Sequence, residues 1–199
     1  MKTVCLDTSH RTLTIALIED DKLVYGFQKD AFKAQSETIM VELNAAFNYV
    51  GWTPRQMDEM VITDGPGSYT GIRIAMTIAK VICQQANLPL YTLSSLLLLA
   101  GMNNYALALM DARSHRAYVG IYQNGVSIME DCVLPLTEIE ALLVADMTIA
   151  GDGSLIDKAS VITDLPQHFL DLKMFWKRVE NIHTLQPRYL KESELYLKP

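Results

Sequence analysis

Three short strand-like stretches open the chain, the second of them with apolar residues at every other position, and a stretch with a helical period follows them. Strands are expected at Thr3–Leu6, around Leu13–Leu17 and at 23–28, joined by short polar turns into an antiparallel meander. From Ser36 to Val50 the apolar residues fall three and four positions apart, which predicts an amphipathic helix. This order of elements indicates an α/β protein in which helices cover a sheet.

A string rich in glycine separates the next predicted strand from a second helix. Gly51 is suited to end the first helix, and the short apolar run Glu59–Thr63 predicts a fourth strand. The string Asp64–Arg73, DGPGSYTGIR, follows, and apolar residues continue beyond it with helical spacing. We therefore expect a helix from about Ser68 to Asn87.

The second half of the chain repeats this order more weakly. Asn124-Gly125 lies between two strand-like runs, which is a strong signal for a β-hairpin. A helix is expected at Thr137–Val144, and another after the loop Gly151–Ser154. The pattern predicts a duplicated β-β-β-α-β-α unit, with a first lobe at 1–102 and a second, shortened lobe at 103–199.

Two interpretations of the glycine string are open. A strand, a glycine-rich turn and a helix N-terminus are the ingredients of an anion site. However, the P-loop requires Lys and Ser or Thr after its last glycine, and here Gly71 is followed by Ile72-Arg73. The pattern also lacks the glycine spacing of a dinucleotide site or a serine nucleophile elbow. The simpler interpretation is that the glycines turn the chain while Ser68 or Thr70 caps the helix.

The helix after the string is apolar on most of its circumference. Its polar residues form one narrow stripe: Arg73, Thr77, Lys80 and Gln84. A helix of this kind must bury more than one side. The second buried side could be satisfied by the chain's own core or by a partner protein, and both explanations stay open here.

Composition and charge favour a globular protein without a nucleic-acid-binding surface of its own. The 199 residues include 17 basic and 23 acidic ones, for a formal net charge of −6, and no run of Lys or Arg occurs. Cys5, Cys83 and Cys132 lie far apart in apolar surroundings, which favours buried free thiols in a reducing compartment. With no apparent signal segment and no membrane-spanning segment expected, we predict a cytoplasmic protein.

The sequence offers little support for a metal site or for acid–base catalysis. Its four histidines are not paired at the spacing of metal ligands, and no CxxC motif occurs. Asp7 follows the first strand, where a nucleotide-binding fold would place a carboxylate near the metal. The next residues, Thr8-Ser9-His10, contain no glycine that would let phosphates approach the backbone. A turn-forming role for Asp7 is therefore favoured over a functional one.

Several of these strings together resemble the bacterial TsaB proteins, also called YeaZ. They are Asp7-Thr8-Ser9, the string from Gly65 to Arg73, Asp111-Ala112-Arg113 and Pro187-Arg188-Tyr189-Leu190. The resemblance covers the whole chain, and the glycine string is its most specific part. It implies the fold shared by actin, hexokinase and DnaK-type chaperones (ASKHA), with two ribonuclease-H-like lobes of mixed sheets flanked by helices.

The resemblance also implies a function in forming N6-threonylcarbamoyladenosine on tRNAs that read codons beginning with A. Proteins of this kind are non-catalytic companions of a paralogue, TsaD, which carries the metal and transfers the threonylcarbamoyl group. An ATPase, TsaE, joins the pair. ATP and a metal are thus expected in the partner subunits and not in this chain alone, and tRNA is expected to bind only through the complex.

Two sets of residues carry the site expectations. The proposed partner interface, which would also form a homodimer of the isolated chain, consists of Ile39, Met40, Leu43, Phe47, Ile72, Met76 and Ala79. The motif loop, expected to shape and cap the second helix, consists of Gly65, Pro66, Gly67, Ser68, Thr70, Gly71 and Arg73. No catalytic residue is assigned. The alternative function is a stand-alone ATP-dependent small-molecule kinase of the same fold.

Overall fold

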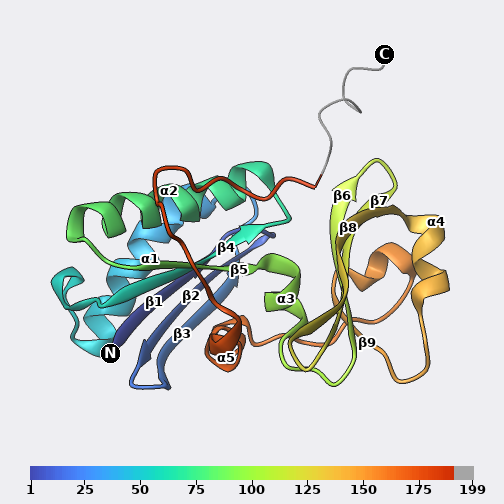
Figure 1. Cartoon of the computed structure of the whole chain (residues 1–199), viewed down its shortest axis with the longest axis horizontal. Coiled ribbons are helices and arrows are strands. Elements are labelled where there is room, and N and C mark those ends of the chain that lie inside the picture. The colour runs from blue at the N-terminus through green and yellow to red at the C-terminus, as the bar shows by residue number, and fades with distance from the viewer. Residues whose placement is uncertain (191–199) are drawn as a thin grey trace, which may run out of the picture.

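The computed structural model describes residues 1–190, which form two sheets side by side with helices around and between them (Figure 1). The first sheet has six strands in the order β10-β5-β4-β1-β2-β3. These strands are β1 (Lys2–Asp7), β2 (Thr12–Glu19), β3 (Lys22–Asp30), β4 (Glu59–Gly65), β5 (Leu90–Ser94) and β10 (Lys177–Arg178). Strands β1, β2 and β3 form the predicted antiparallel meander, and β4 pairs in parallel with both β1 and β5.

The second sheet repeats the first in its strand order and in its sense of pairing. It contains β6 (Ala106–Arg113), β7 (Arg116–Gln123), β8 (Val126–Pro135) and β9 (Thr148–Gly151). Its order, β8-β7-β6-β9, corresponds to β3-β2-β1-β4, and β6 and β9 are parallel as β1 and β4 are. The hairpin turn has both Asn124 and Gly125 at positive φ, 47° and 80°, as the Asn-Gly signal predicts.

Two long helices cover one face of the first sheet. Helix α1 (Gln35–Val50) ends at Gly51, whose φ of 70° is the left-handed conformation that glycine favours. Helix α2 (Tyr69–Ala86) begins after Ser68 and ends at Asn87, which is also left-handed. The predicted bounds of both helices are confirmed to within one residue. Their inward side chains join apolar residues of β1, β2 and β4 in one core.

The opposite face of the first sheet shares a second core with the second sheet. Helix α3 (Ser95–Ala100) lies between the two sheets in Figure 1, and α5 (Leu165–Asp171) packs below it. Apolar residues of β1, β4 and β6 meet these helices in a single cluster that includes Cys5, Val61, Met110 and the fully buried Phe169. The two lobes are therefore joined by a continuous apolar interior.

Helices of the second lobe are shorter than the sequence indicates. The expected helix at Thr137–Val144 is one turn of α-helix, α4 (Leu136–Ile139), followed by a 3₁₀ turn, η2 (Glu140–Leu142). The helix expected after the 151–154 loop is only a 3₁₀ turn, η3 (Gly153–Ile156), because Asp157 adopts a left-handed conformation and stops it. Two further 3₁₀ turns are η1 (Pro54–Gln56) and η4 (Lys173–Phe175).

The end of the described chain returns to the first lobe. Strand β10 pairs with β5, and residues 179–190, which we call the strap, then run across α2 (Figure 1). Lys80 on α2 donates to the carbonyl oxygens of His183 and Leu185, which fixes the strap in place. The expected second lobe, 103–199, thus includes segments that pack on the first sheet, and residues 191–199 lie outside the described part.

Candidate functional site

The motif loop turns the chain from β4 into α2. The peptide bond between Gly65 and Pro66 is cis, and Ser68 is the first residue before the helix. The Ser68 hydroxyl accepts a hydrogen bond from the Gly71 amide at 3.2 Å. The predicted cap is therefore confirmed, with Ser68 rather than Thr70 in that position.

Two positions of the loop require glycine, because the backbone of the turn after β1 packs directly against them. A Cβ atom at Gly67 would overlap the carbonyl oxygen of Ser9, and one at Gly71 would overlap that of Thr8. The Thr8 hydroxyl donates to the Gly71 carbonyl at 2.6 Å and accepts from the Ala75 amide at 3.3 Å. The glycines of the string therefore let its backbone lie directly against the backbone of the turn after β1, because they have no side chain in the way.

Several amides of the loop and of the turn after β1 already donate hydrogen bonds within the protein. The Ser68 amide donates to the Ser9 carbonyl at 2.7 Å, and the Gly71 amide is held by the Ser68 hydroxyl. Asp7 is 2% exposed and accepts hydrogen bonds from the Ser9 amide, at 2.9 Å, and from the Thr63 hydroxyl. These three amides are already paired within the protein, which supports the turning and capping interpretation, whereas the buried Ser9 hydroxyl has no partner among the described residues.

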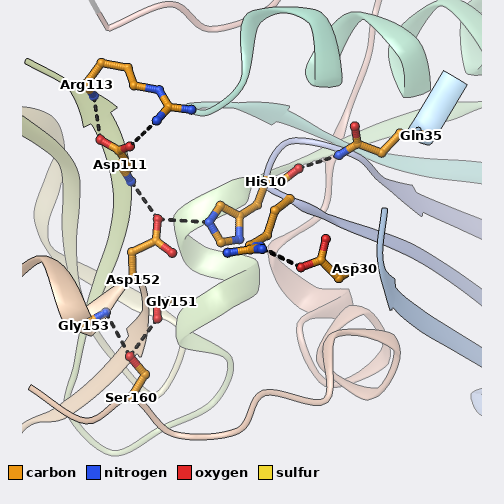
Figure 2. Close-up of polar contacts among 10 residues, drawn as sticks. His10, Asp30, Gln35, Asp111, Arg113, Gly151, Asp152, Gly153 and Ser160 are labelled. Atoms are coloured by element: carbon orange, nitrogen blue, oxygen red, sulfur yellow. Dashed lines mark hydrogen bonds and ion pairs between the residues drawn. The ribbon is translucent and has the colours of Figure 1, made fainter. Parts of the chain in front are cut away.

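A polar contact joins the two lobes beside this turn (Figure 2). His10 Nε2 lies 3.0 Å from Asp152 Oδ2, and the same oxygen accepts from the Asp111 amide at 2.8 Å. Burial by itself would raise the pKa of Asp152, but the hydrogen bond and charge of His10 together with the Asp111 amide hold it below its ordinary value. Arg113 pairs with Asp111 at 2.8 Å on the exposed rim. Sequence reasoning missed His10 and Asp152 as a pair because 142 residues separate them.

A second junction ties the strap to both lobes, and sequence reasoning missed it as well. Arg188 Nη2 donates to the Gly65 carbonyl and to Asp131 Oδ2, each at 2.6 Å. The Asp131 side chain on β8 is 2% exposed and also accepts from the hydroxyls of Ser94 and Tyr122. Burial, together with the Asp131 charge, raises the pKa of Tyr122. The one sequence signal was Arg188 itself, within the closing string of the resemblance.

Most of the expected interface residues point into the core. Side chains of the expected set that are at most 6% exposed are Ile39, Leu43, Phe47, Ile72, Met76 and Ala79. Only Met40, which is 51% exposed, lies on the outer surface. The helical period identified an apolar face for each helix correctly, but that face is the one that covers the sheet.

The outer surface of α1 and α2 is nevertheless rich in apolar side chains. Met40, Val41 and Tyr49 on α1 and Val81 on α2 are all more than half exposed. Ile74, Ile78 and Ile82 of α2 are partly buried. Near the start of both helices lies a shallow groove of about 420 Å³, lined by Ser36, Tyr69, Thr70, Arg73, Ile74, Thr77 and Ile78.

Other expectations can be compared with residues 1–190. Cys5, Cys83 and Cys132 are free thiols, the first two buried. No group of three or more potential metal-ligating side chains gathers within the described range. No helix there is long and apolar enough to cross a membrane.

Comparison with known proteins identifies relatives across most of the chain. The family model described as "TsaD: tRNA N6-adenosine threonylcarbamoyltransferase" matches residues 28–173. The chain is 32% identical over 137 residues to the tRNA threonylcarbamoyladenosine biosynthesis protein TsaB of Bacillus subtilis, an alignment that spans 67% of this chain and 60% of that protein. Its identity to the protein of the same name from Escherichia coli is 27% over 135 residues, 63% of this chain and 58% of that protein.

The fold also matches a solved structure over nearly its whole length. YeaZ from Pseudomonas aeruginosa superimposes with a TM-score of 0.80 at 22% identity, covering 95% of this chain and 99% of that one. The two chains therefore share one fold.

Proposed function

Because this chain belongs to the family of the TsaD model and, within it, to the TsaB (YeaZ) proteins, we propose that it takes part in forming N6-threonylcarbamoyladenosine on tRNA. Its part in that reaction is that of a non-catalytic subunit. It pairs with a TsaD paralogue that transfers the threonylcarbamoyl group, and the ATPase TsaE joins the pair. The tRNA is bound by the complex and not by this chain alone.

The observation that carries the proposal is the apolar outer surface of α1 and α2. Met40, Val41, Tyr49 and Val81 are each more than 50% exposed there, on the two longest helices of the described chain. Large apolar side chains exposed on neighbouring helices are a common feature of protein interfaces. A TsaD paralogue with the same fold would present equivalent helices, so that the two pairs of helices form a bundle.

The same surface would pair two copies of the isolated chain. A paralogous partner and a second copy offer similar helices, and a two-fold contact uses one patch on both molecules. We therefore propose that the chain is a homodimer when isolated and exchanges this contact for TsaD.

The partners, rather than this chain, supply ATP and a metal. This assignment is supported by the hydrogen bonds that Asp7, Ser9, Ser68 and Gly71 already make within the protein. A stand-alone kinase would need phosphate-binding groups at these positions. Calorimetry with ATP and magnesium on the isolated chain tests the point, and micromolar binding would favour the kinase.

Reconstitution tests the function directly. Purified TsaD and TsaE from the same genome, unmodified tRNA and threonylcarbamoyl-adenylate are combined with and without this chain, and the modified nucleoside is measured by mass spectrometry. We expect modification to fall strongly when the chain is omitted and to be absent with the chain alone. Full modification without the chain would contradict the proposal.

A surface variant tests the docking face. Met40→Asp places a charge on the outer side of α1, and we expect loss of both the homodimer and TsaD binding with folding retained. Met76, which is 4% exposed, cannot serve as an interface probe, because a carboxylate there would be buried in the core. Loss of the homodimer with unchanged TsaD affinity in Met40→Asp would separate the two surfaces.

A further inference from the structure

Two tyrosines and an arginine form an exposed cluster where the strap crosses the start of α2. The rings of Tyr69 and Tyr189 stack with centroids 5.1 Å apart and an interplanar angle of 19°. The Arg73 guanidinium lies over the Tyr69 ring, 5.3 Å from its centroid, and donates to the Tyr69 hydroxyl at 3.1 Å. Tyr69 is 60% exposed and Tyr189 is 46% exposed. The cluster is thus preformed and still accessible.

The strap holds its half of the cluster at fixed points. The Arg188 amide donates to the Asp64 carbonyl at 2.7 Å, and the Arg188 side chain binds Gly65 and the buried Asp131. Lys80 binds the strap four and six residues before Tyr189 by way of two carbonyl oxygens, those of Leu185 and His183. Tyr189 is therefore positioned on α2 by contacts on its N-terminal side, which lowers the entropy lost when a partner binds it.

Arg73 has no carboxylate partner among residues 1–190. Its polar contacts are the phenol groups of Tyr189 and Tyr69, whose hydrogen bonds and charge raise the pKa of the guanidinium. The ion pairs of the described chain use Arg11, Arg113 and Arg188 but not Arg73. Within the described part of the chain, the Arg73 guanidinium is thus not paired with an acid, and it lies at the rim of the groove that also contains Ile74 and Ile78.

We propose that the Tyr69–Arg73–Tyr189 cluster is the centre of the TsaD-docking surface, and that TsaD places a carboxylate against Arg73 and an apolar side chain in the adjacent groove. This inference rests on the proposed function. Tyrosine and arginine are the residue types that most often dominate the binding energy of protein interfaces. Charge complementarity at such a site selects the partner and steers the encounter. The strap therefore contributes to docking together with α1 and α2.

A protein partner fits these observations better than RNA does. The groove beside the cluster includes the apolar side chains of Ile74 and Ile78, and the chain as a whole carries a net charge of −6, which disfavours contact with phosphates. The two rings also stack on each other, so they do not leave a ring pair open for a base between them.

Binding measurements with single variants test the inference. Affinity of the purified chain for TsaD from the same genome is measured by calorimetry at about 50 mM and about 500 mM NaCl. Arg73→Met removes the charge and keeps much of the length, and we expect it to weaken binding about tenfold at low salt and to reduce the salt dependence. Tyr189→Ala should weaken binding to a similar extent. Arg55→Met, on the exposed η1 turn, is the matched control and should bind as the wild type does.

The outcomes distinguish this inference from the proposed function. Wild-type affinity and salt dependence in both Arg73→Met and Tyr189→Ala, with unchanged circular dichroism, would overturn the cluster as the centre of docking while leaving the subunit function intact. Failure of the wild-type chain to bind TsaD would contradict the proposed function itself, and the inference about the cluster with it. Light scattering and a binding assay with tRNA transcript complete the test. If Arg73→Met abolished only self-association, or only binding of tRNA to the isolated chain, the cluster would belong to a second copy or to RNA, and the assignment to TsaD would be wrong.

Discussion

The two lobes share a strand order and differ in what covers it. In the first lobe, helices of 16 and 18 residues, α1 and α2, lie over one face of the sheet. At the corresponding places the second lobe has α4 with η2, and η3, which are short turns. A sheet topology can therefore be repeated without its helical layer, because the second sheet gains much of its burial from α3 and the shared core.

The loops at the ends of corresponding strands also differ between the lobes in what they contact. After β1 and β4, the Thr8 and Gly71 backbones pack together and anchor a long helix. After β6 and β9, Asp111 and Asp152 instead make polar contacts that reach the first lobe through His10. The first lobe thus uses its loops to anchor a long helix, and the second lobe uses its loops for polar contacts between the lobes.

The largest effect is expected where the first-lobe loops touch. Gly71→Val would place a side chain on the Thr8 carbonyl and displace α2, which should destabilise the protein by about 3 kcal/mol. Gly51→Ala is the control: it has nothing within 4 Å and costs only its left-handed conformation, about 1 kcal/mol. Urea denaturation measures the free energy of unfolding of both variants. Equal losses of stability would show that the contact between Gly71 and Thr8 is not crowded.

The second largest effect is expected where Asp131 on β8 binds Arg188 of the strap. Asp131→Asn removes the charge that Arg188, Ser94 and Tyr122 share, and we expect a loss of about 2 kcal/mol in the free energy of unfolding. Asp111→Asn, which breaks the exposed pair with Arg113, should cost at most about 0.5 kcal/mol. A smaller cost for Asp131→Asn than for Asp111→Asn would mean that the strap junction does not stabilise the two lobes.

A moderate effect is expected at the cap of α2. Ser68→Ala removes the acceptor for the Gly71 amide and should cost about 1 kcal/mol, with modification activity largely retained in the complete reconstituted system. Thermal denaturation and the nucleoside assay measure the two quantities. Loss of all turnover in a folded, TsaD-bound Ser68→Ala protein would show that this hydroxyl has a chemical function.

The smallest effect is the pH dependence of the contact between His10 and Asp152. The pKa of Asp152 is lowered below 3.8 in the folded protein, so its contribution is present above that pH and is lost as the pH falls through the folded value. We expect Asp152→Asn to cost about 0.5 kcal/mol at neutral pH and the difference from the wild type to shrink as the pH falls through the folded pKa of Asp152. Urea midpoints across this range measure it, and a difference that grew on acidification would contradict the assignment.

Local chemistry in the sequence determined where several elements begin, end or turn. Gly51, Ser68 and the Asn124-Gly125 turn act through their own backbone and immediate neighbours, and the structure has them as predicted. The helix expected at 137–144 is present but shorter, as the single turn α4 followed by η2, which ends at Leu142. A short apolar pattern indicates a helix, but only packing against a sheet decides how many turns it keeps.

Tertiary structure alone decided which side chains meet. The sequence showed that α2 is apolar on more than one side, but the position of the sheet turns Ile72 and Met76 inward and leaves Ile74 and Ile78 nearer the surface. Likewise, Arg188 reaches Gly65 across 123 positions, and the strap crosses α2 only because β10 pairs with β5. Contacts between distant segments leave no local signature, since they depend on how the whole chain folds and not on the conformational preferences of neighbouring residues.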